Sequence, residues 1–144
     1  MILLSQRKKT AAKKYQRPTD YFRDFHDWPK NWMEIDKDLI VGNALLTLFA
    51  TFVESLIKQA LAVKTIKIHM GNLAVLASEV IRRLNDGDQK NRKLTTINLL
   101  LKYIDAEQGP LVHFWDPSNC TDEALIRSFD ATCKKLYKFI LTLN

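Results

Sequence analysis

Residues 51–73 of this chain are TFVESLIKQALAVKTIKIHMGNL, and this stretch decides the fold. Apolar side chains recur every three or four residues up to Ala60 and again from Ile66 onward, a spacing that places them on one face of an α-helix. Residues 61–63 separate the two runs, and Lys64-Thr65-Ile66-Lys67 opens the second one. The stretch therefore predicts two apolar helices joined by a short break.

The same periodicity predicts the neighbouring elements. We expect the first helix to run from about Asp38 to Ala60 and the second from about Lys64 to Leu84. Residues 85–88, NDGD, favour a turn, because Asn, Asp and Gly tolerate left-handed backbone angles. A third helix is expected over roughly 94–106 and a last one from near Thr121, a good N-cap residue. These elements predict an all-α fold, a single-domain orthogonal bundle of about four to five helices.

The composition fits one globular domain. The chain has 144 residues, of which 47% are apolar, and it contains only 4 glycines and 4 prolines. This length is sufficient to bury a hydrophobic core, and the scarcity of glycine favours helices over a β-sandwich. We divide the chain into a basic, flexible arm (1–19), an aromatic entry segment packed on the body (20–36) and a helical domain (37–144).

The excess positive charge is concentrated in the arm. The net charge is +6, and the arm holds six basic residues and no acid, so the rest of the chain is neutral overall. These basic residues are Arg7, Lys8, Lys9, Lys13, Lys14 and Arg17. Such an arm can neutralise phosphates and steer association with nucleic acid or another anionic surface. The alternative interpretation is a frayed terminus that only increases solubility.

The entry segment is rich in aromatic residues. Tyr21, Phe22, Phe25 and Trp28 have the spacing of one face of a short helix, which we expect Pro29 to end. Exposed aromatic rings could stack on nucleic-acid bases. The favoured interpretation is that this segment packs on the helical body and buries its large side chains there.

The two helices and the break between them resemble the N-terminal core-binding domain of tyrosine recombinases, the phage integrases, which has a SAM-like fold. In that family a helix ending in a Phe-Leu-x-x-Leu-like run is followed by a Ser-x-Lys-Thr-Ile-like start, and the second helix lies against DNA. The matching part is mainly residues 49–84. The resemblance implies that Lys64, Thr65 and Lys67 contact the phosphate backbone of double-stranded DNA.

A physical argument supports the same contact. The N-terminus of a helix offers free backbone N–H groups and the positive end of the helix dipole, so it binds phosphate readily. The chain departs from the family pattern at two positions, with Ala62 in place of the usual N-cap Ser and Val63 in place of the usual Pro. The alternative interpretation is a packed helix whose lysines are simply solvated.

The catalytic half of a tyrosine recombinase is absent from the sequence. That half needs an Arg, a Lys, a His-x-x-Arg, a further His or Trp and a nucleophilic Tyr, and none of His26, His69 and His113 has an Arg three residues later. Gly-rich phosphate loops, nucleophile elbows and His-Glu-x-x-His motifs are also absent. We therefore expect no enzymatic activity, no cofactor and no small-molecule substrate.

The remaining polar residues predict no metal site. Cys133 lies on the apolar face of the last predicted helix and is expected to be a buried thiol, and His69 a hydrogen-bonded core residue. Since no secretion signal is visible and no apolar run approaches the roughly 20 residues of a membrane span, we expect a cytoplasmic protein with reduced Cys120 and Cys133.

Two functions remain open at this point. The first is a non-catalytic DNA-binding protein that contacts phosphates through its arm and the start of the second helix. The second is a helical protein–protein interaction module, such as a regulatory or antitoxin-like partner or homo-oligomer in a mobile element or prophage. The second function is supported by aromatic residues beyond those a core needs (Trp28, Trp32, Phe114, Trp115) and by the apolar Ile68 and Val75 on a polar helix face.

Overall fold

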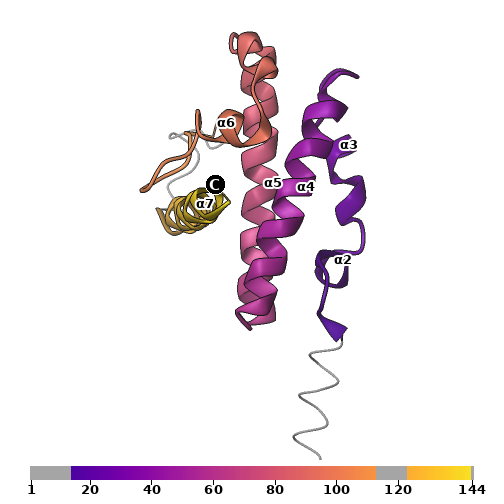
Figure 1. Ribbon diagram of the computed structural model, residues 1–144, viewed down its shortest axis with the longest axis vertical. Helices are drawn as coiled ribbons and strands as arrows, with labels where there is room; N and C mark the ends of the chain where they lie inside the picture. The colour runs from indigo at the N-terminus through magenta and orange to yellow at the C-terminus, as the bar shows by residue number, and fades with distance from the viewer. Residues whose placement is uncertain (1–13, 113–122, 144) are drawn as a thin grey trace, which may run out of the picture.

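The computed structural model in Figure 1 describes residues 14–112 and 123–143. The described residues form helices and turns and contain no strand. In chain order the elements are α2 (Pro18–Tyr21), η1 (Phe25–Asp27), α3 (Trp28–Trp32), α4 (Asp38–Lys58), α5 (Val63–Asn85), η2 (Gln89–Lys93), α6 (Thr96–Leu100) and α7 (Glu123–Thr142). The predicted all-α helical bundle is confirmed.

The body consists of the three long helices. α4 and α5 pack against each other in opposite directions, and the turn between them contains Ala60 in the left-handed region (φ 59°). α7 packs across α5, so Figure 1 shows α7 along its axis while α5 stands upright. Gly87, with φ 117°, lies in the turn after α5, as the NDGD sequence predicted. The first two predicted helices are thus confirmed, whereas the predicted start near Thr121 lies outside the described residues.

An aromatic series joins the entry segment to the core. The ring centroids of Phe25 and Trp28 are 5.0 Å apart, those of Trp28 and Trp32 are 6.3 Å apart, and those of Trp32 and Phe49 are 6.2 Å apart. All four side chains are buried, as is Tyr21. Edge-on contacts of this kind add to the large apolar area that each ring removes from water. The expected burial of these aromatic side chains is therefore observed, and the entry segment shares the core of the bundle.

The helical form predicted for the entry segment is wrong. The chain makes a separate turn at 22–24, and Pro29 occupies the second position of α3 instead of ending a helix. Proline is tolerated in the first turn of a helix, because the N–H group that it lacks has no intrahelical partner there. Tyr21, Phe25 and Trp28 are nevertheless all buried, since successive short elements bring them to the same core.

The third predicted helix is much shorter than expected. α6 begins after Thr95, whose side chain accepts a hydrogen bond from Asn98 N at 3.2 Å, and it ends at Leu100. Turns follow, in which the Asp105 carboxylate accepts a hydrogen bond from Gln108 N at 2.9 Å. Asp favours such local side-chain bonds to the backbone over continuation of a helix. The prediction of a helix over 94–106 was therefore wrong in its C-terminal half.

The chain after α6 approaches α7 closely at Gly109. A Cβ atom at this position would lie 2.5 Å from Cys133 Sγ and 2.8 Å from the Phe129 ring, so only glycine fits. Gly109 N also donates a hydrogen bond to Asp130 Oδ1 at 3.1 Å. Burial, together with the charge of Asp130, raises the pKa of the Cys133 thiol to about 12. Cys133 is therefore the buried core thiol that its position predicted.

α4 is long and apolar enough to cross a membrane by length and composition, with a mean hydropathy of 1.8 over its best window. This corrects the expectation that no apolar run in the chain reaches that length. In the fold, one stripe of α4 is buried against the neighbouring helices through Leu45, Phe49 and Phe52. A helix at the centre of a hydrophobic core has the same apolar composition.

A buried carboxylate fixes the upper end of the bundle in Figure 1. Asp38 has 0% exposure and forms an ion pair with Arg92 Nη2 at 2.7 Å. It also accepts hydrogen bonds from Glu34 N (2.9 Å), Ile35 N (3.0 Å) and Asn85 Nδ2 (3.0 Å). Burial alone raises the pKa of Asp38, but these hydrogen bonds outweigh burial and lower the pKa to about 2. The ionised carboxylate thus connects the start of α4, the end of α5 and η2.

α7 is attached to α5 by a small polar cluster. His69 Nδ1 and Thr132 Oγ1 are 2.7 Å apart, and Asn72 Nδ2 donates hydrogen bonds to Thr132 Oγ1 at 2.8 Å and Ser128 O at 3.1 Å. Burial, with a smaller contribution from the positive charge of Lys135, lowers the pKa of His69. Neutral His69 is therefore the form that the α5–α7 interface favours, and its hydrogen bond to Thr132 agrees with the predicted core role.

We predict that Asp38→Asn lowers the free energy of unfolding by about 3 kcal/mol, because it leaves Arg92 buried without its counter-charge. In the wild-type protein the stabilisation from ionised Asp38 is complete above about pH 4. It falls by about 2 kcal/mol as the pH drops through the folded pKa of about 2. Urea unfolding measured across pH tests both statements. The exposed Asp36→Asn is the matched control and should change stability by less than about 0.5 kcal/mol.

We also predict that His69 makes the protein less stable in mild acid. Because its pKa is lowered on folding, the unfolded chain binds the proton more readily, so stability falls as the pH drops below about 6.5. Urea unfolding should show a shallower dependence on pH for His69→Gln than for the wild type over that range. An NMR titration of the imidazole gives the direct check, and a midpoint at or above about 6.5 would contradict the prediction.

Candidate nucleic-acid-binding surface

The start of α5 presents its first turn to solvent. Ala62 occupies the N-cap position and supplies no side-chain hydrogen bond to the backbone, as its sequence implied. Lys64 and Thr65 follow in the first turn, and both are exposed. Among the backbone N–H groups at the start of α5, that of Ile66 is the first to donate a hydrogen bond along the helix, to Ala62 O at 3.0 Å. The helix therefore begins with uncapped N–H groups next to a positive charge and a hydroxyl, an arrangement that favours a phosphate oxygen.

Lys67 connects this helix start to the entry segment. Its Nζ atom lies 5.9 Å from the centroid of the Phe22 ring, within the range of a cation–π contact. The lysine side chain itself is exposed, so its charge faces solvent as well as the ring. The short helix α2 also contacts both α4 and α5. The place where the described chain begins and the start of α5 therefore lie at the same end of the bundle (Figure 1).

The described part of the arm contributes two further cations to this end. Lys14 and Arg17 are both exposed, and Lys14 Nζ lies 5.5 Å from the centroid of the Tyr15 ring. Arg17 is 3.7 Å from Asp20, whose carboxylate also accepts a hydrogen bond from Arg17 N at 2.9 Å. Such an exposed pair is weak in water, so it leaves the guanidinium available to a phosphate. The other predicted arm residues lie outside the described residues: Arg7, Lys8, Lys9 and Lys13.

The basic connector after α5 does not belong to this surface. η2, which carries Lys90, Arg92 and Lys93, follows the opposite end of α5 (Figure 1). Arg92 donates to Asp38 Oδ1 at 2.7 Å and to Asn85 Oδ1 at 2.6 Å, so its charge is used inside the fold. The structure thus brings two groups of predicted phosphate-binding residues to one end of the bundle. The first group, Lys14 and Arg17, precedes α2, and the second, Lys64, Thr65 and Lys67, lies at the start of α5.

Three lysines near this end were not predicted to take part. Lys58 ends α4 and is exposed, directly before the turn that leads to Lys64. Lys135 and Lys138 on α7 line a groove that also includes Gln59, so α7 brings two more positive charges towards the end of α4. In the sequence these α7 lysines fit a favourable interaction with the helix dipole, and only the packing of α7 shows their position.

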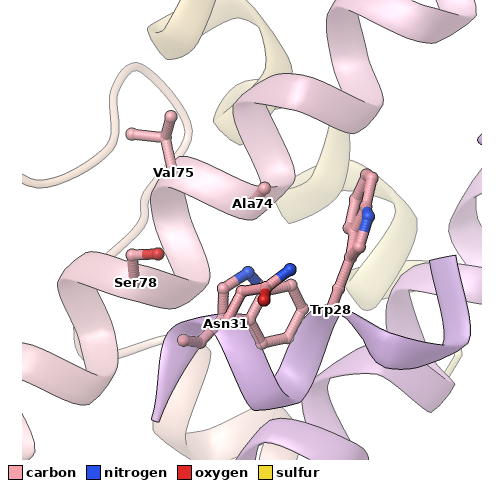
Figure 2. A pocket seen from close by; sticks show the side chains of 6 residues that line it. Trp28, Asn31, Ala74, Val75 and Ser78 are labelled. Atoms are coloured by element: carbon pink, nitrogen blue, oxygen red, sulfur yellow. The ribbon is translucent and has the colours of Figure 1, made fainter. Parts of the chain in front are cut away.

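The described residues hold no cluster of three or more His, Cys, Asp or Glu side chains that could bind a metal ion. A hollow of about 270 Å³ lies between α3 and α5, near the middle of the bundle. Figure 2 shows Trp28 and Asn31 of α3 facing Ala74, Val75 and Ser78 of α5 across it. Its lining carries no charged side chain, and the Ser78 hydroxyl and the Asn31 amide lie among apolar groups, so the hollow offers mainly shape and apolar surface.

Comparisons with known protein families, with curated proteins and with solved structures found no match to this chain.

Proposed function

We propose that this protein is a non-catalytic, double-stranded DNA-binding protein that contacts phosphates through its basic arm and through the start of α5. The observation that carries the proposal is the position of Lys67 against Phe22, because it places two segments distant in sequence at one end of the bundle. Lys14, Arg17 and Lys64 are exposed at that same end. Converging lysines, an open helix N-terminus and an arm are the features that position a protein on a DNA backbone.

The two ends of the body differ in how their arginines are used and in which of them presents a helix start. At the upper end of Figure 1, Arg92 is neutralised by Asp38, and Arg82 is paired with the buried Glu79 at 2.8 Å. Lys64 and Lys67 at the α2 end form no salt bridge within the described residues, and the same holds for Lys90 and Lys93 at the upper end. A DNA duplex carries a negative charge about every 1.7 Å along its axis, and only the α2 end adds the open N-terminus of a long helix to its free cations.

We predict that the double variant Lys64→Glu/Lys67→Glu weakens binding to duplex DNA at least about tenfold and lowers the salt slope of log affinity by about 2. Fluorescence anisotropy with a labelled random-sequence duplex, measured over a range of salt concentrations, gives both quantities. The matched control is Lys90→Glu/Lys93→Glu, which makes the same charge change at the other end and should have little effect. Wild-type binding that is absent at low salt, or that does not change with salt, rejects the proposal.

The contribution of the arm is tested separately. Charge reversal of Lys8, Lys9, Lys13 and Lys14 should weaken binding to duplex DNA at least as much as reversal of the two α5 lysines, because it removes twice as many positive charges. The circular dichroism spectrum and thermal midpoint should be unchanged, since Lys14, the member within the described residues, is exposed. Equal duplex affinity for this variant and the wild type would confine DNA binding to the body.

The second candidate function is a helical protein–protein interaction module, a regulatory or antitoxin-like partner in a mobile element or prophage. Trp28 and Trp32 give this function no support, because both side chains are buried in the core. Phe114 and Trp115, the other two aromatic residues predicted to take part, lie outside the described residues. The observation that favours it is the number of exposed apolar side chains on and just after α7. They are Leu125, Ile126, Leu141 and Leu143. Size-exclusion chromatography with light scattering distinguishes a homo-oligomer from a monomer.

A further inference from the structure

One face of α4 is open to solvent. In Figure 1, α5 packs against one side of α4, and α2 and α3 pack against the other. Five uncharged side chains of α4 are exposed, and they recur every three or four residues, so they lie on one face of the helix. The open face of α4, as we call it, consists of Ile40, Asn43, Ala44, Thr47 and Thr51. It extends for roughly 16 Å along the helix.

The absence of charge from the open face is unusual for a helix in contact with water. α4 has no Asp, Glu, Lys or Arg between Asp38 and Glu54. The exposed surfaces of the other two long helices, by contrast, carry lysines such as Lys67 of α5 and Lys135 of α7. A face that is only solvated usually carries charged side chains. Only 39% of the most apolar window of α4 is buried, so the core accounts for just part of its composition.

The side chains of the open face suit close contact with another helix. Ile40 is 77% exposed and supplies an apolar group at one end. Thr47 Oγ1 donates to Asn43 O at 3.0 Å and Thr51 Oγ1 donates to Thr47 O at 3.2 Å, so both hydroxyls donate within α4 and leave their methyl groups to a neighbour. Ala44 and the two threonines are small, which allows the axes of two helices to approach closely.

The two ends of the open face carry opposite charges. Asp36 lies in the turn just before α4, Lys58 is the last residue of α4, and both are exposed without a salt bridge within the described residues. Each of them lies eleven residues from Thr47. In an antiparallel pair with a two-fold axis at Thr47, Asp36 of each copy therefore faces Lys58 of the other. A parallel pair would instead bring equal charges together at both ends, which is unfavourable.

Glu54 is compatible with the same antiparallel arrangement. Glu54 lies seven residues after Thr47 and Ile40 lies seven residues before it, so the two face each other across the pair. The exposed Lys37 of the second copy is three residues beyond Ile40, about one helical turn, and is the nearest cation to the Glu54 carboxylate. The antiparallel arrangement thus places no two like charges opposite each other.

We propose that the open face of α4 pairs with the same face of a second copy of this chain, antiparallel and with Thr47 at the two-fold axis. A crossing angle near the common value of about 20° keeps the ends of the two helices close enough for Asp36 and Lys58 to meet. One helix pair buries less area than a standard interface, so we expect a weak dimer with a Kd in the micromolar range. The proposal goes beyond both candidate functions: it does not depend on DNA binding, and it assigns self-association to α4 and not to the exposed residues of α7.

Sedimentation equilibrium of the full-length chain, from micromolar to millimolar concentration, tests the pairing. The wild type should show a reversible monomer–dimer equilibrium. Thr47→Glu should weaken the dimer at least about tenfold, because two carboxylates would meet at the two-fold axis. The matched control is Thr142→Glu on α7, an exposed threonine whose hydroxyl also bonds within its own helix. This control should dimerise like the wild type, and circular dichroism should show that both variants are folded.

A charge swap tests the antiparallel arrangement. Asp36→Lys and Lys58→Glu each replace two contacts between opposite charges by two contacts between like charges, so each should weaken the dimer at least about threefold. The double variant Asp36→Lys/Lys58→Glu restores opposite charges at both contacts and should recover the wild-type affinity. Both residues are exposed at the ends of the helix, so these variants remain informative even if Thr47→Glu fails to fold.

Four results would overturn the proposal. The first is a folded wild type that stays monomeric at millimolar concentration. The second is a dimer that Thr47→Glu leaves intact, and loss of that dimer in Leu141→Arg would then assign the interface to α7. The third is a double charge-swap variant that dimerises no more tightly than the single variants. The fourth is a monomeric wild type that sediments with phosphatidylcholine vesicles unless Thr47 is replaced by Glu, because the open face would then contact lipid. None of these results involves duplex DNA, so failure of the DNA-binding proposal is distinguishable from failure of this one.

Discussion

The ionised carboxylate of Asp38 is the interaction that joins the start of α4, the end of α5 and η2. It is fully buried, yet it holds three segments through Arg92, Asn85 and the amides before α4. A buried charge is tolerated only where it is paired and hydrogen-bonded, so Arg92 is committed to the interior. The connector after α5 therefore keeps only Lys90 and Lys93 as exposed cations. At the opposite end of α4 and α5, Lys64 and Lys67 are exposed beside an open helix N-terminus.

The position of α7 creates the second feature of the molecule. The first half of α7 is fixed on α5 by the hydrogen bond from Asn72 to Thr132. Cys133 packs directly against Gly109, where any side chain in place of the glycine hydrogen would clash with the thiol. The second half of α7 meets α4 through Phe139 and Phe52. Polar contacts set the orientation of α7 on α5, whereas the aromatic contact with α4 leaves an open groove beside it. The same helix therefore completes the core and brings Lys135 and Lys138 beside Gln59.

Local periodicity was sufficient to locate α4 and α5, because each carries a continuous apolar stripe that only the helical spacing explains. It failed where a short segment had competing possibilities. Pro29 lies in the first turn of α3, where an earlier helix was expected to end, and Asp105 bonds to the backbone where a helix was expected. The candidate site was predictable only as separate pieces. The contact of Lys67 with Phe22 and the use of Arg92 by Asp38 both join residues distant in sequence, so they depend on tertiary packing that no local pattern specifies.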